Sequence, residues 1–222
     1  MTQHDRTRVE EDLRGQLDGD VHCDPLFVQL YASDASVYEV RPLGVVRPRN
    51  TADVVATVRY AVENQIALHA RGSGSGLAGE SLGKGLIVDF SRYMSRLVEQ
   101  RDDGVVHGQA GVVLDQLNQS LARRGRLLGP DPANSAVTTV GSMAALDASG
   151  SRRLAYGSMR DHVVEIEAVL ATGEAVRLST HKIPEHPPSR EDDPIGFLTH
   201  GVAALLDRYA AEIEAYGRRA AP

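Results

Sequence analysis

The sequence predicts a domain that mixes helices and strands and carries two unusual loops. An apolar run near residue 44, a capped helix pattern and a second apolar run at 66–70 indicate a β-α-β unit. That unit leads into a long glycine-rich loop and a further strand, Leu86–Val88. A second stretch, residues 127–157, is rich in small residues and too long for an ordinary connection.

Composition bounds the classes of protein. The chain has 222 residues, enough for one large domain or two small ones. Its net charge of −6 argues against a nucleic-acid-binding surface. The single cysteine, Cys23, excludes a disulfide framework and an iron–sulfur cluster held by this chain alone. No apolar stretch approaches about 18 residues and the charged N-terminus is not a signal peptide, so we expect a cytoplasmic protein without a transmembrane segment.

The glycine-rich loop is a candidate cradle for a diphosphate. It comprises Arg71, Gly72, Ser73, Gly74, Ser75, Gly76, Leu77 and Ala78. Glycines let the backbone come close to a ligand, and successive N–H groups in such a loop can form a concave anion site. Serine hydroxyls and a guanidinium add donors that suit phosphate oxygens. The alternative is a flexible surface loop.

Two common phosphate motifs do not account for this loop. Residues 74–79 match G-x-G-x-x-G, but Gly83 and Gly85 precede a strand, so no helix can begin there to receive a pyrophosphate. Lys84 is not followed by Ser or Thr, which excludes a Walker loop. We therefore expect the loop to hold phosphate with backbone and serine groups, without a helix dipole.

The N-terminal half contains further predicted elements. Residues 1–20 are highly charged, with apolar residues at helical spacing, and predict a short amphipathic helix. The next segment, 21–38, is expected to be anchored by four apolar side chains. These are Leu26, Phe27, Leu30 and Tyr31. Short strands are expected at 37–40 and 44–46. Asn50 or Thr51 then caps a helix that ends near residue 64.

The C-terminal half begins with a hairpin pattern over 97–106, turning at Asp103-Gly104. The remaining elements follow in order. They are a core helix over 114–121 closed by Gly125, a short helix over 140–146, a strand within 163–170 that pairs with 176–178, a linker at 180–194, and an amphipathic helix over 195–216. The apolar face of that last helix requires a partner.

The small-residue stretch at 127–157 is the second candidate functional region. Pro130-Asp131-Pro132 forms a stiff, extended turn. The residues that follow, 138–142, supply hydroxyls and a glycine. So many small groups together indicate close packing or the close approach of something flat. The alternative is a long loop wrapped over the core.

In this order, the segments resemble one family, the FAD-binding domain of the FAD-linked 2-hydroxyacid oxidases and dehydrogenases. That family includes D-lactate dehydrogenase and the flavin subunit of glycolate oxidase. The resemblance covers about residues 30–178 and lies in YASDASVYEVRPLGVVRPRNTADV, RGSGSGLAGE, GPDPANSAVTTVGSMAA and AYGSMRDHVVEIEAVLATGE. Each segment alone is weak, but their shared order makes the signal strong.

The resemblance implies an α+β fold, the two-subdomain vanillyl-alcohol-oxidase or PCMH-type FAD-binding fold. Residues 1–20 would form an N-terminal helical segment. The FAD-binding domain would span 21–178, with subdomains at about 21–90 and 95–178 and FAD between them. Residues 179–222 would form a linker and a helix leading to a substrate or cap domain.

The resemblance also implies which residues contact the cofactor. Arg71 to Ala78 would hold the FAD diphosphate, and Pro130, Asp131 and Pro132 would lie beside the isoalloxazine ring. Backbone and hydroxyl contacts would come from Thr138, Gly141, Ser142 and Ala145. Ser149, Gly150, Tyr156 and Gly157 would close over the cofactor, and the strand at Val164 would touch it. No residue of this chain is expected to act as a catalytic acid or base or to bind a metal.

Two departures from the family pattern bear on the cofactor. Family members usually have a second glycine and then asparagine where this chain has Ser142 and Met143, which removes one flavin contact. Members with covalently attached flavin carry histidine at the position of Ser75. With serine there and Cys23 elsewhere, we expect non-covalent FAD.

The function implied is that of an FAD domain in an oxidoreductase acting on a 2-hydroxyacid such as D-lactate or glycolate. The family's catalytic residues lie in a following cap, so we expect a piece of a longer enzyme, inactive alone, with an iron–sulfur region after the cap in some relatives. The sequence does not name the electron acceptor. One alternative is a non-catalytic flavin-binding or interaction module. Another is a nucleotide-binding protein unrelated to flavin.

Overall fold

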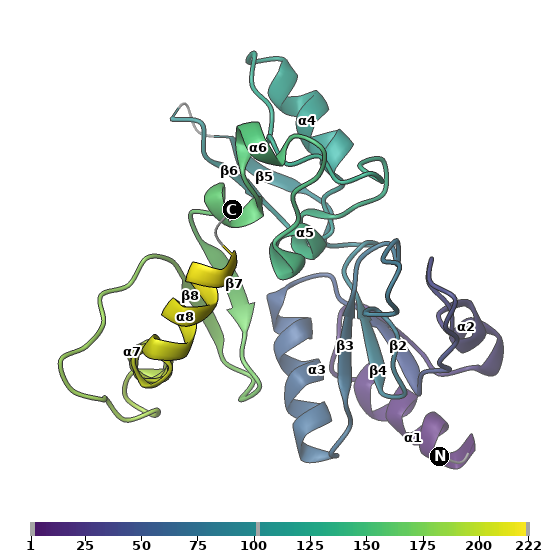
Figure 1. The fold of residues 1–222 in the computed structure, drawn as a ribbon. Coiled ribbons are helices and arrows are strands. Elements are labelled where there is room, and N and C mark those ends of the chain that lie inside the picture. The colour runs from purple at the N-terminus through teal and green to yellow at the C-terminus, as the bar shows by residue number, and fades with distance from the viewer. Residues whose placement is uncertain (1–2, 101–102, 221–222) are drawn as a thin grey trace. The chain divides into compact units, whose positions relative to one another are not determined.

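Figure 1 shows the computed structural model, which describes residues 3–100 and 103–220. These residues form two compact units. The first contains Met1–Val163 together with Val169–Ala175. The second contains Val164–Ala168 and Val176–Pro222. The glycine-rich loop and the stretch 127–157 both belong to the first unit.

A four-stranded sheet in the first unit carries the glycine-rich loop. Its order is β1 (Asp20–His22), β2 (Gly44–Arg47), β4 (Leu86–Asp89) and β3 (Leu68–Arg71). β1 is antiparallel to β2, whereas β2, β4 and β3 are parallel. The central strand β4 is buried throughout. The run predicted as a buried strand at 66–70 begins two residues later and is only partly buried, because β3 is an edge strand.

Three helices accompany this sheet: α1 (Gln3–Arg14), α2 (Pro25–Leu30) and α3 (Thr51–Glu63). Asn50 caps α3, since its side chain accepts a hydrogen bond from Asp53 N at 2.9 Å. The helix ends at its C-cap Asn64, as predicted. One core cluster joins α1 and α3 to the sheet. It includes Val9, Leu13, Val21, Cys23, Leu43, Val46, Tyr60 and Leu86.

The chain returns from β3 to β4 through residues 72–85 without forming a helix. Parallel strands need a long crossover connection, which is usually helical. Here the loop runs back along β3, and a Cβ on Gly85 would lie 1.8 Å from the Ala67 carbonyl oxygen. Leu86 N donates to the same oxygen at 2.9 Å and so begins β4. The sheet therefore presents an open loop where a helix is the usual connection.

The rest of the first unit contains a two-stranded sheet and short helices. The strands are β5 (Leu97–Gln100) and β6 (Val106–Gly108), which pair antiparallel as predicted. The helices are α4 (Leu114–Ala122), α5 (Val140–Leu146), α6 (Arg153–Tyr156) and the 3-10 turn η1 (Met159–Asp161). α4 and α5 match their predictions, whereas α6 and η1 were not predicted. Leu114, Met143 and Met159 pack together in one core cluster.

The second unit contains β8 (Ala175–Leu178) from Val176 onward, most of β7 (Ile166–Val169), and two helices. The helices are α7 (Pro194–Arg208) and α8 (Ala210–Ala220). β7 and β8 pair as predicted. The prediction of one helix over 195–216 is wrong, because helix α7 ends at its C-cap, Tyr209, and a separate helix, α8, follows. The helical spacing of apolar residues continues past Tyr209, so the sequence pattern does not indicate where α7 ends.

Three other predictions are wrong. Leu26 and Leu30 are 77% and 66% exposed, because α2 is short and buries Val28 instead. Residues 37–40 form no strand and contribute only a single bridge, between Ser33 and Glu39. Val164 precedes β7 and is not part of it, although the alternating pattern of apolar residues extends that far.

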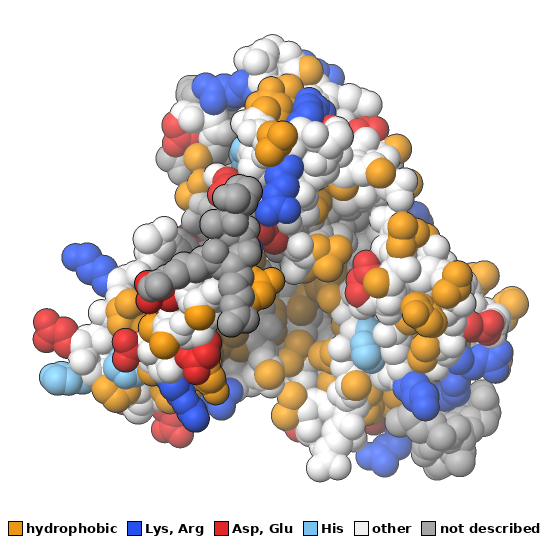
Figure 2. All heavy atoms as spheres, viewed as in Figure 1, with side chains coloured by type: hydrophobic (Ala, Val, Ile, Leu, Met, Phe, Trp, Pro, Cys, Tyr) orange, Lys and Arg blue, Asp and Glu red, His pale blue; other side chains and the backbone are white. Residues whose placement is uncertain are grey.

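The surface mixes charge types. On the face seen in Figure 2, basic and acidic side chains are interspersed with uncharged ones. Within residues 3–100 and 103–220, no helix combines the length and apolarity needed to cross a lipid bilayer.

Candidate functional site

The segment before β2 braces the glycine-rich loop. Arg71, the last residue of β3, donates from Nη2 to the Ser33 carbonyl at 2.9 Å. Farther along the loop, Ala35 N donates to the Gly74 carbonyl at 3.0 Å. These bonds fix the loop at two points and leave residues 75–78 without such a brace in the contacts described.

Asp34 shapes the bracing segment. Its carboxylate accepts from Ser36 N at 2.8 Å, which forms a local turn, and from Ser81 Oγ at 3.0 Å. Burial opposes ionisation of Asp34, but the hydrogen bonds from Ser36 and Ser81 outweigh it and lower its pKa. The family resemblance includes this segment, but its contacts with the glycine-rich loop were not predicted. Aspartate followed by serine two residues later was the available signal.

The Arg71 guanidinium is held in place but is one acceptor short. Its Cζ lies 5.2 Å from the centre of the Tyr31 ring. Gly74 has φ of +71°, and a Cβ there would lie 2.3 Å from Arg71 Nη2. Nη1 is buried and has no hydrogen-bond partner among the residues that the structure describes. A buried guanidinium N–H without an acceptor is costly, and a phosphate oxygen is a suitable acceptor.

The Tyr31 side chain is itself held by a hydrogen bond to the sheet. Its hydroxyl donates to Asp89 Oδ2 at 2.7 Å, and Asp89 is buried at the end of β4. Burial and this hydrogen bond raise the pKa of Tyr31 above its ordinary value. The ring under the guanidinium therefore remains neutral at physiological pH.

The two unusual stretches of the sequence meet at Gly72. A Cβ on Gly72 would lie 2.4 Å from Thr139 Oγ1 and 2.6 Å from Ser142 Oγ. These two hydroxyls share a hydrogen bond of 2.8 Å at the start of α5. Gly141, between them, packs on Ala110, where a Cβ would lie 2.7 Å from the Ala110 Cβ. Glycine at position 72 thus lets the loop backbone come close to the hydroxyl groups at the start of α5.

Met143, one of the expected departures from the family pattern, has a packing role in the core. Its side chain is fully buried in the core that α5 shares with Leu114 and Met159. An apolar, flexible side chain fills this core position. Met143 therefore contributes packing at this position.

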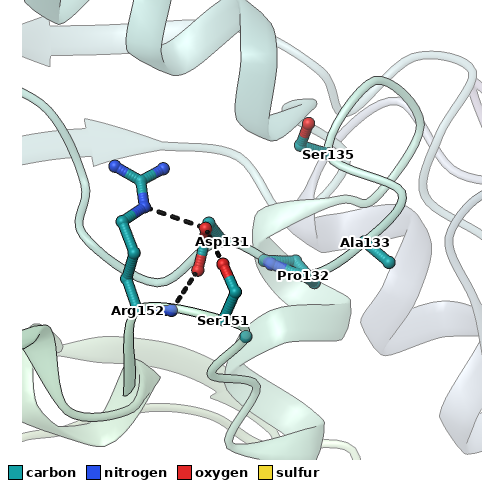
Figure 3. Close-up of a pocket in the computed structure, with 7 residues that line it drawn as sticks. Asp131, Pro132, Ala133, Ser135, Ser151 and Arg152 are labelled. Atoms are coloured by element: carbon teal, nitrogen blue, oxygen red, sulfur yellow. Dashed lines mark hydrogen bonds and ion pairs between the residues drawn. The ribbon is translucent and has the colours of Figure 1, made fainter. Parts of the chain in front are cut away.

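Asp131 lies at the centre of a second group of residues, which Figure 3 shows. Pro132 and Gly150 of this group were predicted to contact the cofactor, whereas Ser151 and Arg152 were not. Asp131 pairs with Gly150 in an isolated parallel bridge. Its carboxylate accepts from Ser151 Oγ at 2.7 Å, Arg152 N at 3.0 Å and Arg152 Nε at 2.8 Å. Hydrogen bonds from Arg152 and Ser151 lower the pKa of Asp131 to about 2. An open hollow of ≈ 450 Å³ lies here, lined by Asp131, Pro132, Ala133, Ser135, Gly150, Ser151 and Arg152.

The other predicted residues differ in exposure. Pro130 is buried, Ser149 is partly exposed, and Leu77, Ala78 and Ala145 are exposed. The Thr138 hydroxyl donates to the Asn134 carbonyl at 2.9 Å.

Tyr156 covers Gly129, where a Cβ would lie 2.6 Å from the tyrosine ring. Gly157 follows with φ of +73°. Val164 is 65% exposed and belongs to the second unit. Of the predicted residues, Gly72 and Ser142 lie together in one group, and Asp131, Pro132 and Gly150 lie together in another.

A protein-family model described as "FAD binding domain" matches residues 42–179 of this chain. The chain belongs to this family of FAD-binding domains. The predicted cofactor, FAD, follows from that membership.

Curated relatives of this FAD-binding domain include two kinds of dehydrogenase. D-2-hydroxyglutarate dehydrogenase of Escherichia coli (strain K12) is 40% identical over 157 residues, which are 69% of this chain and 15% of that protein. D-lactate dehydrogenase of Archaeoglobus fulgidus is 37% identical over 136 residues, 60% of this chain and 30% of that protein. The chain therefore spans only a small part of each relative's length.

Solved structures confirm the predicted fold. An alkyldihydroxyacetonephosphate synthase superposes with a TM-score of 0.67 at 21% identity, covering 82% of this chain and 38% of its own. The 6-hydroxy-D-nicotine oxidase of Arthrobacter nicotinovorans has a TM-score of 0.64 at 24% identity, covering 73% and 36%. The FAD-binding domain thus has the α+β, vanillyl-alcohol-oxidase-type fold.

Proposed function

We propose that this chain binds FAD without covalent attachment and serves a longer oxidoreductase that acts on 2-hydroxyacids. The observation that carries the proposal is the meeting of the glycine-rich loop with α5 at Gly72, where a single Cβ would separate them. When bound, FAD supplies the acceptor for the electrons removed from the substrate. The residues of this chain bind and orient it.

The residues around Arg71 fit a diphosphate. The buried Nη1 without a partner among the described residues supports an anion here, and so do the serines and backbone N–H groups of residues 72–76. Arg71 to Ala78 would hold the diphosphate. Pro130, Asp131 and Pro132 would lie by the flavin ring, with the segments at 138–145 and 149–157 completing the wall.

Non-covalent binding is supported by the side chains at the positions where attachment would occur. Ser75 stands where the family resemblance implies histidine in members with covalently attached flavin. Cys23 is 1% exposed, and burial raises the pKa of its thiol to about 12, so it is a poor nucleophile.

The substrate class rests on the relatives. Those named above are, by name, dehydrogenases of D-2-hydroxyglutarate and of D-lactate. We propose a 2-hydroxyacid substrate, with a cap domain and any iron–sulfur region in the remainder of a longer protein located in the cytoplasm. Anaerobic mixing of the longest natural form with D-2-hydroxyglutarate, D-lactate or glycolate should bleach its flavin absorbance. If none of these three compounds bleaches the flavin, the proposed 2-hydroxyacid substrate class is refuted.

Cofactor binding is tested by titrating the purified chain with FAD, FMN and riboflavin. FAD should bind most tightly, since the cradle recognises a diphosphate. Arg71→Gln should weaken FAD binding about tenfold or more, the usual effect of losing a charge-assisted hydrogen bond. Arg92→Gln is the matched control, because Arg92 also lies over a tyrosine, Tyr93, at 5.6 Å. Equal binding of FAD and riboflavin would contradict the proposal.

A further inference from the structure

One carboxylate joins the two segments that the proposed function puts beside the flavin ring. Asp131 lies between Pro130 and Pro132, and it accepts three hydrogen bonds from Ser151 and Arg152. Figure 3 shows Ser151 and Arg152 turned toward this carboxylate. A single side chain thus holds residues 150–152 against residues 130–132.

The backbones of the two segments are also in close contact. Gly150 has φ of +126°, and a Cβ there would lie 2.2 Å from the Asp131 carbonyl oxygen. Glycine is required at this position for both the conformation and the space. The Asp131 carboxylate therefore reinforces a contact that already permits very little movement.

Arg152 carries the compensating charge at the edge of the hollow. Its Nε is used by Asp131, while its side chain remains 47% exposed. Its Cζ lies 5.9 Å from the centre of the Tyr156 ring. Tyr156 is also proposed to line the flavin site. The pair is neutral as a whole, so removing either partner leaves one net charge in the wall of the hollow.

We propose, on the basis of the proposed function, that Asp131 and Arg152 are positioning residues that fix one wall of the flavin-ring site and keep it electrically neutral. A charge close to the flavin ring changes how easily the ring accepts negative charge. An uncompensated guanidinium favours the reduced flavin, and an uncompensated carboxylate disfavours it. The two single substitutions should therefore have opposite effects.

The test measures the midpoint potential of bound flavin and the FAD dissociation constant in the 222-residue chain. Asp131→Asn should raise the potential, Arg152→Gln should lower it, and both should weaken FAD binding by about tenfold. Arg152→Lys, which keeps the charge, should retain a potential close to that of the unmodified chain.

Asp147→Asn is the matched control. Asp147 accepts from Arg160 N at 2.9 Å and Arg160 Nε at 2.6 Å, the same arrangement outside the proposed wall. Asp147 has φ of +48°, which asparagine tolerates well. This variant should change neither quantity.

The outcomes separate the two proposals. If the unmodified chain binds no FAD, the proposed function fails and this inference fails with it. If it binds FAD but Asp131→Asn and Arg152→Gln shift the potential in the same direction or not at all, only the inference fails. A shift with Arg152→Lys as large as that with Arg152→Gln would also overturn the charge argument.

Discussion

Gly72 decides whether the glycine-rich loop can approach α5. The hydroxyls of Thr139 and Ser142 occupy the space that a side chain would need. Their own hydrogen bond and the α5 backbone hold them there. Glycine is needed here for lack of space and not for its conformation, since the backbone of Gly72 is not in the left-handed region.

Gly72→Ala should therefore destabilise the first unit by about 1–3 kcal/mol, as overpacking does in a well-packed contact. It should also weaken FAD binding, since the loop must move away from α5. Urea unfolding and FAD titration measure the two effects. Gly201→Ala is the control: a Cβ there meets nothing within 4 Å in α7, so stability should rise by about 0.5–1 kcal/mol without loss of FAD. Unchanged stability of Gly72→Ala would contradict the close contact.

At the scale of elements, the sequence correctly predicted features that depend on neighbouring residues alone, such as the cap of α3 and the bounds of α5. Asn50 and Thr51 were the two predicted caps, because either side chain can accept a hydrogen bond from a free N–H of the first turn, and Asn50 is the cap of α3. α5 was predicted over the residues it occupies. The exposure of Leu26 and the break at Tyr209 depend on which face of a helix finds a partner, and no local pattern records that.

The α3 cap offers a direct test at this scale. Asn50→Ala should cost about 0.5–2 kcal/mol of stability because Asp53 N loses its acceptor. Asn50→Ser retains an acceptor oxygen and should recover most of the loss. Urea midpoints at constant m-value give the comparison. Equal losses in both variants would mean that the cap bond contributes little.

At the scale of the whole molecule, the sequence predicted the fold and the order of its segments but not the contacts between them. Arg71 and Asp131 could be selected as candidates from motif and resemblance. Their partners, Ser33 and Arg152, lie on segments whose approach depends on the tertiary fold. The contacts of residues 33–36 with the glycine-rich loop were not predicted for this reason, although the local turn at Asp34 has a sequence signal.

Acid should destabilise the molecule through its hydrogen-bonded aspartates. The pKa of Asp131 is lowered from 3.8 to about 2, and those of Asp20, Asp34 and Asp147 are also lowered. A carboxyl whose folded pKa is depressed contributes stability above its unfolded pKa and loses that contribution as pH falls toward its folded pKa. The midpoint temperature of thermal unfolding should therefore decrease as the pH is lowered from about 4 to about 2. Asp131→Asn should show a shallower decline, and an identical pH profile would count against the Asp131 bonds.

The most direct measurement of the central claim is an absorbance spectrum of the purified chain after saturation with FAD and removal of free cofactor. The account predicts flavin bands that remain with the folded protein and pass wholly into the supernatant once the protein is denatured and precipitated. Flavin that stays with the precipitate would contradict non-covalent binding. A chain that retains no flavin at any FAD concentration would contradict the cradle at Arg71 to Ala78.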